Sequence, residues 1–260
     1  MPDVSAIAQR ILDAYRTGAP IAPVRGEITG VDQAYAVQRA TIDRWLAEGR
    51  KLAGQKIGLT SKAVQAQLGV DEPDFGALFA DMVLADGAVV PRSRVLQPRI
   101  EGEIAFVLKA DLAGDRAGRI TPQDVIAATE YVTPAIEICG SRIANWDIRI
   151  EDTIADDASS GLIVLSGRRI APDLAALAAV TLTIRHNGEV AAEGRGDACL
   201  GNPANAVAWL GEALLRFGTR LRAGDIVMSG ALAKMLPAGP GSRFAAEFGS
   251  YGSVSVAFAA

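Results

Sequence analysis

The sequence predicts an α+β protein in which a mostly β body curls into a barrel-like roll, with a helical appendage at the N-terminus. From about Val83 onward, many short strand-like segments follow one another with few helices between them. Glycine-rich turns such as Gly239-Pro240-Gly241 fit such a roll. Two helical patterns come first, so we expect the appendage over residues 1–50 and a main body over residues 51–260.

The apolar residues of segments 3–17 and 32–48 recur every three or four positions, which is the spacing of an amphipathic helix. Gly18 and Gly49 follow these segments, and glycine commonly ends a helix. Asn202-Pro203 forms a cap and first-turn pair that begins a later helix. The further predicted helices cover residues 61–68, 122–128, 173–178 and 202–217.

The predicted strands cover residues 87–90, 100–108, 131–138, 161–165, 180–186, 189–193, 225–229 and 252–258. Asn187-Gly188 indicates a hairpin turn between two of them, which places His186 in an exposed turn. Because His186 is the single histidine, neither a histidine-based zinc site nor a Ser-His-Asp triad is expected. The chain also lacks GxGxxG and P-loop patterns, so nucleotide binding has no support.

The composition is that of a globular protein, with 260 residues, half of them hydrophobic. The formal net charge of -4 argues against nucleic acid or an anionic membrane as a partner. There is no signal pattern and no apolar run of about 18 residues, so no membrane span is expected. Cys139 and Cys199 have neither metal-binding nor CxxC spacing, which favours reduced thiols in a cytoplasmic protein.

Three glutamates stand alone in apolar, strand-like runs. Glu101 and Glu103 are two residues apart and therefore project from one face of a strand. Two carboxylates held close together and away from water repel each other, and magnesium or manganese would relieve that repulsion. Glu137 is the obvious third ligand. The alternative is that Glu101 and Glu103 face solvent or pair with arginines 92 and 99, and spacing alone leaves both readings open.

Lys56 and Asp74 are candidates for acid–base chemistry. Lys56 lies among small and apolar residues, where it could hold a buried anion, although a surface lysine gives the same pattern. Asp74 lies in an acidic loop with Pro73 and Gly76, and its composition favours a turn residue. The segment 151–161 packs acids and hydroxyls before an apolar strand, and either lines a pocket or is a solvated loop.

Five segments in this order resemble the 2-keto-4-pentenoate hydratases, which belong to the fumarylacetoacetate hydrolase superfamily. The segments are Lys56–Ser61, Glu72–Gly76, Pro98–Ala105, Pro134–Glu137 and Asp152–Gly161. The resemblance extends over nearly the whole chain. It implies a hydration of 2-hydroxypenta-2,4-dienoate to 4-hydroxy-2-oxopentanoate in aromatic meta-cleavage catabolism. It also implies that the chain forms a homo-oligomer. The expected binding partner is a small molecule, the 2-hydroxydienoate or 2-oxo acid substrate.

The resemblance assigns roles to seven residues. It implies that Glu101, Glu103 and Glu137 bind magnesium or manganese, that Lys56 and Asp74 are catalytic, and that Leu59 and Ser160 contact the substrate.

The resemblance leaves the exact reaction and substrate open. Asp157 stands where relatives often carry asparagine, which puts a role for this position in doubt. The similar 4-oxalocrotonate decarboxylases tend to lack the acid at Asp74, so its presence favours hydration. The length of the substrate remains open, a non-catalytic 2-oxo acid binding protein is an alternative, and the missing pocket histidine argues against histidine-dependent acylpyruvate hydrolysis.

Overall fold

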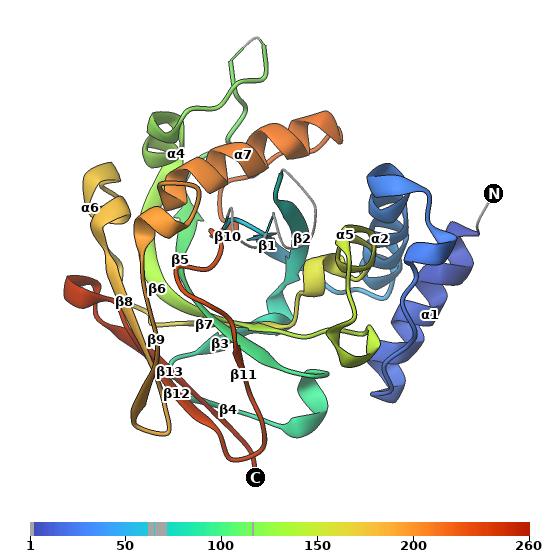
Figure 1. Ribbon diagram of the computed structural model, residues 1–260. Helices are drawn as coiled ribbons and strands as arrows, with labels where there is room; N and C mark the ends of the chain where they lie inside the picture. The colour runs from blue at the N-terminus through green and yellow to red at the C-terminus, as the bar shows by residue number, and fades with distance from the viewer. Residues whose placement is uncertain (1–2, 62–64, 66–71, 116) are drawn as a thin grey trace.

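Two β-sheets face each other in this protein and form a curled roll (Figure 1). The computed structural model describes residues 3–61, 65, 72–115 and 117–260. The larger sheet has the strand order β2-β1-β10-β5-β6-β7-β3, with β11 paired to β5, and the smaller one has the order β4-β13-β12-β8-β9. This α+β architecture confirms the predicted fold class.

The strands of the larger sheet are β1 (Leu52–Gly58), β2 (Asp74–Phe79), β3 (Val83–Ala85), β5 (Arg99–Leu108), β6 (Thr129–Cys139), β7 (Leu162–Leu165), β10 (Ile226–Met228) and β11 (Leu236–Pro237). Those of the smaller sheet are β4 (Ala88–Val90), β8 (Thr181–His186), β9 (Glu189–Arg195), β12 (Arg243–Glu247) and β13 (Ser253–Phe258).

The antiparallel pair β5–β6 forms the centre of the larger sheet and has a different environment on each face. A Cβ atom added at Gly102 would lie 2.7 Å from the nearest side-chain atom of Leu182 and 3.4 Å from one of Ile184, both on β8. The even-numbered residues around Gly102 therefore face the smaller sheet. Since side chains alternate along a strand, the odd-numbered residues of β5 face the opposite side.

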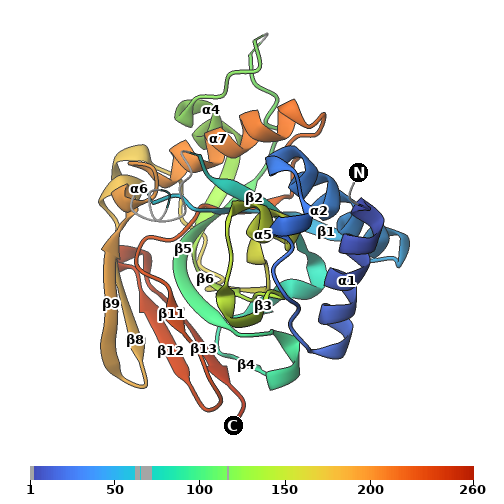
Figure 2. The same cartoon turned by 45° about the vertical axis from the view of Figure 1, so that its right-hand side comes forward.

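Helices α1 (Val4–Thr17) and α2 (Gly30–Ala47) lie together at one side of the roll (Figures 1 and 2). The other helices are α4 (Pro122–Ala128), α5 (Ile150–Ala155), α6 (Leu174–Ala179) and α7 (Pro203–Arg216). The buried side chain of Gln38 joins α2 to the body, because its amide donates to the carbonyl oxygens of Phe75 (2.8 Å) and Ile154 (3.0 Å). None of the helices described here is long and apolar enough to cross a membrane.

Most predicted elements are confirmed to within a few residues, but the loop predicted around Asp74 is wrong. Residues 74–79 form the fully buried strand β2 rather than a loop, because tertiary packing overrides the turn composition of Pro73 and Gly76. Strand β12 and helix α5 were also not predicted. The predicted helix over 61–68 falls largely outside the described residues.

The hairpin at Asn187-Gly188 is confirmed, with φ angles of 53° and 91°. His186 is not an exposed turn residue, however. It is the last residue of β8 and is half-buried, with its Nε2 3.1 Å from Ser242 Oγ and its ring stacked on Phe244. The apolar stacking partner, which lies on the neighbouring strand β12, explains why the turn sequence alone misplaced it.

Candidate active site

Two acidic residues meet across the β5–β6 pair. Glu101 lies directly opposite Glu137 in the strand register, and Arg99 lies opposite Cys139. Single ligand atoms of Glu101, Glu137 and Cys139 all lie within 4.8 Å of one another. Glu103 follows Glu101 on the same face of β5 and is fully buried. The sheet therefore gathers carboxylates that are 36 residues apart in the sequence onto one small surface.

The carboxylates of this surface lack the hydrogen bonds that buried acids normally have. Among the described residues, Oε2 of Glu137 and Oε1 of Glu103 have no hydrogen-bond donor, and Oε1 of Glu137 has only the Lys56 ammonium beside it, at 3.2 Å. The second oxygen of Glu103 accepts from the backbone N–H of Gly230 at 2.8 Å. Orphaned buried oxygens cost free energy unless something else satisfies them. A hard divalent cation fits this donor set, because it prefers carboxylate oxygens.

The pKa values of these acids are raised because the carboxylates are buried and repel one another. Burial, and then the neighbouring Glu137, raises the pKa of Glu101 to about 7. Burial, Glu137 and Glu101 together raise the pKa of Glu103 well above its usual range. Burial also raises the pKa of the Cys139 thiol well above its usual range, with Glu137 and Glu101 adding to the effect. The Cys139 thiol donates to Glu101 Oε2 (3.6 Å), and the carboxylates supply the oxygen ligands that a hard cation prefers.

Lys56 is a buried cation beside these acids, with only 3 % of its surface exposed. Its Nζ lies 3.2 Å from Oε1 of Glu137 and donates to the carbonyl oxygen of Ala158 at 2.8 Å. Burial lowers the pKa of Lys56, but the negative charge of Glu137 and its neighbours outweighs burial and raises the pKa well above the usual value. Lys56 is thus held in its charged form, which makes it an electrostatic partner or a proton donor rather than a base.

Asp74 begins strand β2 and is 1 % exposed, so the turn interpretation of this residue is wrong. Its Oδ2 accepts a hydrogen bond from the Thr153 hydroxyl of α5 at 3.1 Å. Burial raises the pKa of Asp74, and Lys56 and Thr153 offset only part of this rise. A carboxyl group with a raised pKa and one fixed hydrogen bond is suited to taking up and releasing a proton.

Gly58 makes room for this acid, because it pairs with Asp74 in the β1–β2 register. A Cβ atom at position 58 would lie 2.2 Å from Asp74 Oδ1, far inside van der Waals contact. We therefore expect Gly58→Ala to displace the Asp74 carboxylate and to lower kcat at least about 10-fold. Steady-state kinetics and Mn²⁺ titration of the variant test this, and an unchanged kcat would show that the position of Asp74 is not critical.

A cavity of 390 Å³ opens beside these residues. Its polar wall includes Lys56, Asp74, Glu101, Thr153 and Ser159, and its apolar wall includes Trp146, Ile148, Leu232 and Met235. The polar lining residues can hold the charged end of a small acid, and the apolar ones can hold a hydrocarbon portion. A second hollow of 380 Å³ beside α2 contains none of the site residues predicted from the sequence, so the chemistry favours the first.

The two candidate substrate contacts have different surroundings. Leu59 lines the cavity with a positive φ of 59°. Ser160 is buried outside the cavity wall, where its hydroxyl donates to the carbonyl oxygen of Asp157 at 2.6 Å, and its neighbour Ser159 lines the cavity instead.

Three residues of the cavity wall, Cys139, Trp146 and Thr153, were not predicted from the sequence. Only Thr153 had a signal, since it belongs to the segment 151–161 of acids and hydroxyls.

A known protein family covers most of this chain. The family described as fumarylacetoacetate (FAA) hydrolase C-terminal matches residues 50–258, which include all seven candidate residues. The chain belongs to the fumarylacetoacetate hydrolase family.

Two similar proteins are hydratases by name, and one similar solved structure is a decarboxylase. The chain is 49 % identical to 2-keto-4-pentenoate hydratase 2 of Dechloromonas aromatica (strain RCB), over 98 % of this chain and 97 % of the relative. It is 42 % identical to 2-hydroxyhexa-2,4-dienoate hydratase of Comamonas testosteroni, over 96 % and 95 % of the two chains. The 4-oxalocrotonate decarboxylase of Pseudomonas putida G7, solved with magnesium and adipate, superposes with a TM-score of 0.92 at 35 % identity, covering 98 % and 97 % of the chains.

Proposed function

We propose that this fumarylacetoacetate hydrolase family member is a metal-dependent hydratase that converts 2-hydroxypenta-2,4-dienoate into 4-hydroxy-2-oxopentanoate during aromatic meta-cleavage catabolism. The observation that carries the proposal is the buried pair of Asp74 and Lys56 in the wall of the cavity that Glu101 also lines. The identity of 49 % to a 2-keto-4-pentenoate hydratase supports the same reaction.

Glu101, Glu103 and Glu137 would hold magnesium or manganese, and the oxygens of Glu103 and Glu137 that accept no hydrogen bond support this assignment. When bound, such an ion acts as a Lewis acid that polarises the oxygens of a 2-oxo acid. The chain itself contributes the negative charge that retains the ion and the buried surroundings that strengthen electrostatic interactions.

The proton transfers fall to Lys56 and Asp74. Ketonisation removes the proton of the 2-hydroxyl and delivers a proton to carbon 5, which leaves an α,β-unsaturated 2-oxo acid. Water then adds its oxygen to carbon 4 and a proton to carbon 3. The Lys56 ammonium stabilises negative charge on the substrate, and the Asp74 carboxylate, oriented by Thr153, accepts a proton from the attacking water.

A decarboxylase is the second candidate function, because the structure with a TM-score of 0.92 is a 4-oxalocrotonate decarboxylase and Lys234 lines the cavity as a further cation. Lys234 could hold the second carboxylate of a dicarboxylic acid. Against this, Trp146, Ile148 and Met235 give the same cavity an apolar wall that suits an uncharged end.

A substrate panel decides between the two functions. Purified protein with magnesium is incubated with 2-hydroxypenta-2,4-dienoate, with longer 2-hydroxydienoates and with 4-oxalocrotonate, and the products are identified by mass. We expect the short dienoates to gain one water. Loss of carbon dioxide from 4-oxalocrotonate as the fastest reaction would overturn the hydratase proposal, and binding without turnover of any compound would favour a binding protein.

We also propose that the chain works as a homo-oligomer in the cytoplasm. The smaller sheet carries exposed apolar residues on its two edge strands, Val89 on β4 (65 % exposed) and Val190 on β9 (51 %), and such edges favour association. Cys139 and Cys199 are free thiols, as expected in a reducing compartment. Light scattering after size exclusion tests the assembly, and a monomer at micromolar concentration would contradict it.

A further inference from the structure

Three consecutive residues next to the cavity have a backbone conformation that is unfavourable for their type. Asp157, Ala158 and Ser159 have φ angles of 54°, 50° and 54°, in the left-handed region, and none of them is glycine. We call these three residues the left-handed segment. Side chains other than glycine rarely adopt this conformation, so the surrounding structure must hold it in place.

The left-handed segment contacts both β1, at Lys56, and β2, at Ala77. The carbonyl oxygen of Ala158 accepts the hydrogen bond from Lys56 Nζ at 2.8 Å. The carboxylate of Asp157 accepts from the backbone N–H of Ala77 on β2 at 2.8 Å, while Ser159 lines the cavity. If the segment relaxed to ordinary negative φ angles, the Ala158 carbonyl would turn, and Lys56 would lose its only uncharged hydrogen-bond partner among the described residues.

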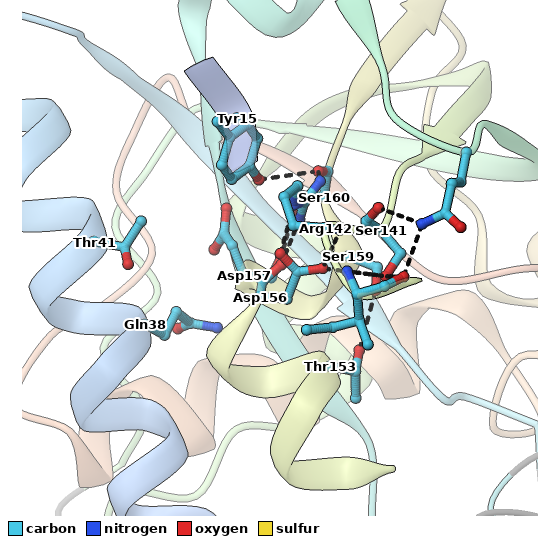
Figure 3. A network of polar contacts seen from close by, with 12 residues as sticks. Tyr15, Gln38, Thr41, Ser141, Arg142, Thr153, Asp156, Asp157, Ser159 and Ser160 are labelled. Carbon is cyan, nitrogen blue, oxygen red and sulfur yellow. Dashed lines mark hydrogen bonds and ion pairs between the residues drawn. The ribbon is translucent and has the colours of Figure 1, made fainter. Parts of the chain in front are cut away.

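A single buried guanidinium holds both ends of the left-handed segment, as Figure 3 shows. Asp156 precedes the segment and Ser160 follows it. Arg142 pairs with the Asp156 carboxylate and donates to the Asp156 carbonyl oxygen at 2.6 Å and to the Ser160 carbonyl oxygen at 2.8 Å. Arg142 is 2 % exposed and Asp156 is fully buried. The planar guanidinium can hold two points at a fixed separation, which a lysine cannot do.

Tyr15 of helix α1 packs against the Arg142–Asp156 pair. Its hydroxyl donates to the Ser160 carbonyl oxygen at 3.5 Å, and its ring centroid lies 4.1 Å from the Arg142 guanidinium carbon. The cation–aromatic contact helps to keep the guanidinium in place. Because the family match begins at residue 50, Tyr15 belongs to a part of the chain that the match does not cover.

We propose that Tyr15, Arg142 and Asp156 are positioning residues for the reaction: they keep the left-handed segment in its strained conformation and thereby fix the Lys56 ammonium beside Glu137. The inference rests on the proposed function, since it gives Lys56 a role in turnover. A buried ion pair is often replaceable by apolar residues without loss of stability, so stability alone does not account for it. The hydrogen bonds from Arg142 to both ends of the strained segment do account for the pair.

The test uses Tyr15→Leu, which removes both the hydroxyl and the aromatic ring. We expect kcat to fall about 10- to 100-fold, while KM and the Mn²⁺ dissociation constant change by less than about threefold. Tyr15→Phe keeps the ring over Arg142 and should restore kcat to within about threefold of the wild type. In a crystal structure of Tyr15→Leu, Ala158 should have a negative φ or its carbonyl should point away from Lys56.

Ile7→Ala is the control on the same helix, because Ile7 is more deeply buried than the half-buried Tyr15 and lies about two helical turns from it. It should lower the melting temperature at least as much as Tyr15→Leu does and leave kcat unchanged. An unchanged kcat in folded Tyr15→Leu, or an equal loss of kcat in Ile7→Ala, would overturn the positioning role. A wild type without hydratase activity would instead overturn the proposed function, and the crystal structure of Tyr15→Leu would still test whether Tyr15 holds the left-handed segment.

Discussion

Replacing Glu137 with glutamine is expected to abolish Mn²⁺ binding at the site and to lower kcat/KM by at least about 1,000-fold. Glu137 lies opposite Glu101 on the neighbouring strand, its Oε1 is 3.2 Å from the Lys56 ammonium, and its Oε2 has no hydrogen-bond donor among the described residues. A neutral amide would leave Lys56 without its nearest counter-charge and the cation without a central ligand. Calorimetric titration with Mn²⁺ and loss of dienoate absorbance with saturating magnesium measure the two effects.

Glu130→Gln provides the control on the same strand, because Glu130 lies on β6 but is exposed and only 3.6 Å from the exposed Arg169. It should behave like the wild type in both measurements. The double variant Glu101→Gln/Glu103→Gln should lose metal-dependent turnover as Glu137→Gln does. Activity that survives treatment with EDTA and these substitutions would refute the metal role of the glutamates.

Replacing Asp74 with asparagine is expected to lower the rate of hydration about 100- to 10,000-fold while Mn²⁺ affinity stays within about threefold of the wild type. Asparagine has the same shape and can still accept the hydrogen bond from Thr153, so folding should be preserved. It cannot take a proton from water, however. The measurements are single-turnover kinetics with the dienoate and the same Mn²⁺ titration.

Asp81→Asn is the corresponding control, since Asp81 lies just beyond the end of β2 and forms an exposed ion pair with Arg50 at 2.9 Å. Its rate should match the wild type. If Asp74→Asn hydrated the dienoate at a rate near that of the wild type, Asp74 would be a structural residue that only accepts the hydrogen bond from the Thr153 hydroxyl.

Periodicity predicted the fold where one face of an element is buried and the other is not. Helices α1 and α2 have such a pattern, and so does β13, whose residues alternate between buried and half-buried or exposed. Strand β2 has no such pattern, since all six of its residues are buried. A fully buried short strand with a glycine in it cannot be distinguished from a loop by spacing.

The candidate site could be predicted only in part, for a similar reason. Lone acids in apolar strands marked Glu101, Glu103 and Glu137, but the register that sets Glu101 opposite Glu137 depends on long-range pairing. The Arg142–Asp156 pair gave no signal, because its 14-residue separation matches no local motif. The left-handed segment gave none either, since an Asp-Ala-Ser sequence contains no glycine to mark positive φ angles.

The alternation along β5 has a consequence for how this protein can change. Gly102, with no side chain, sits against Leu182 and Ile184, while its neighbours Glu101 and Glu103 lie on the opposite face. A larger side chain at Gly102 would push the two sheets apart, whereas a substitution at Glu101 changes a residue that lines the cavity. The lining of the cavity can therefore be altered at Glu101 without disturbing the close approach of the sheets at Gly102.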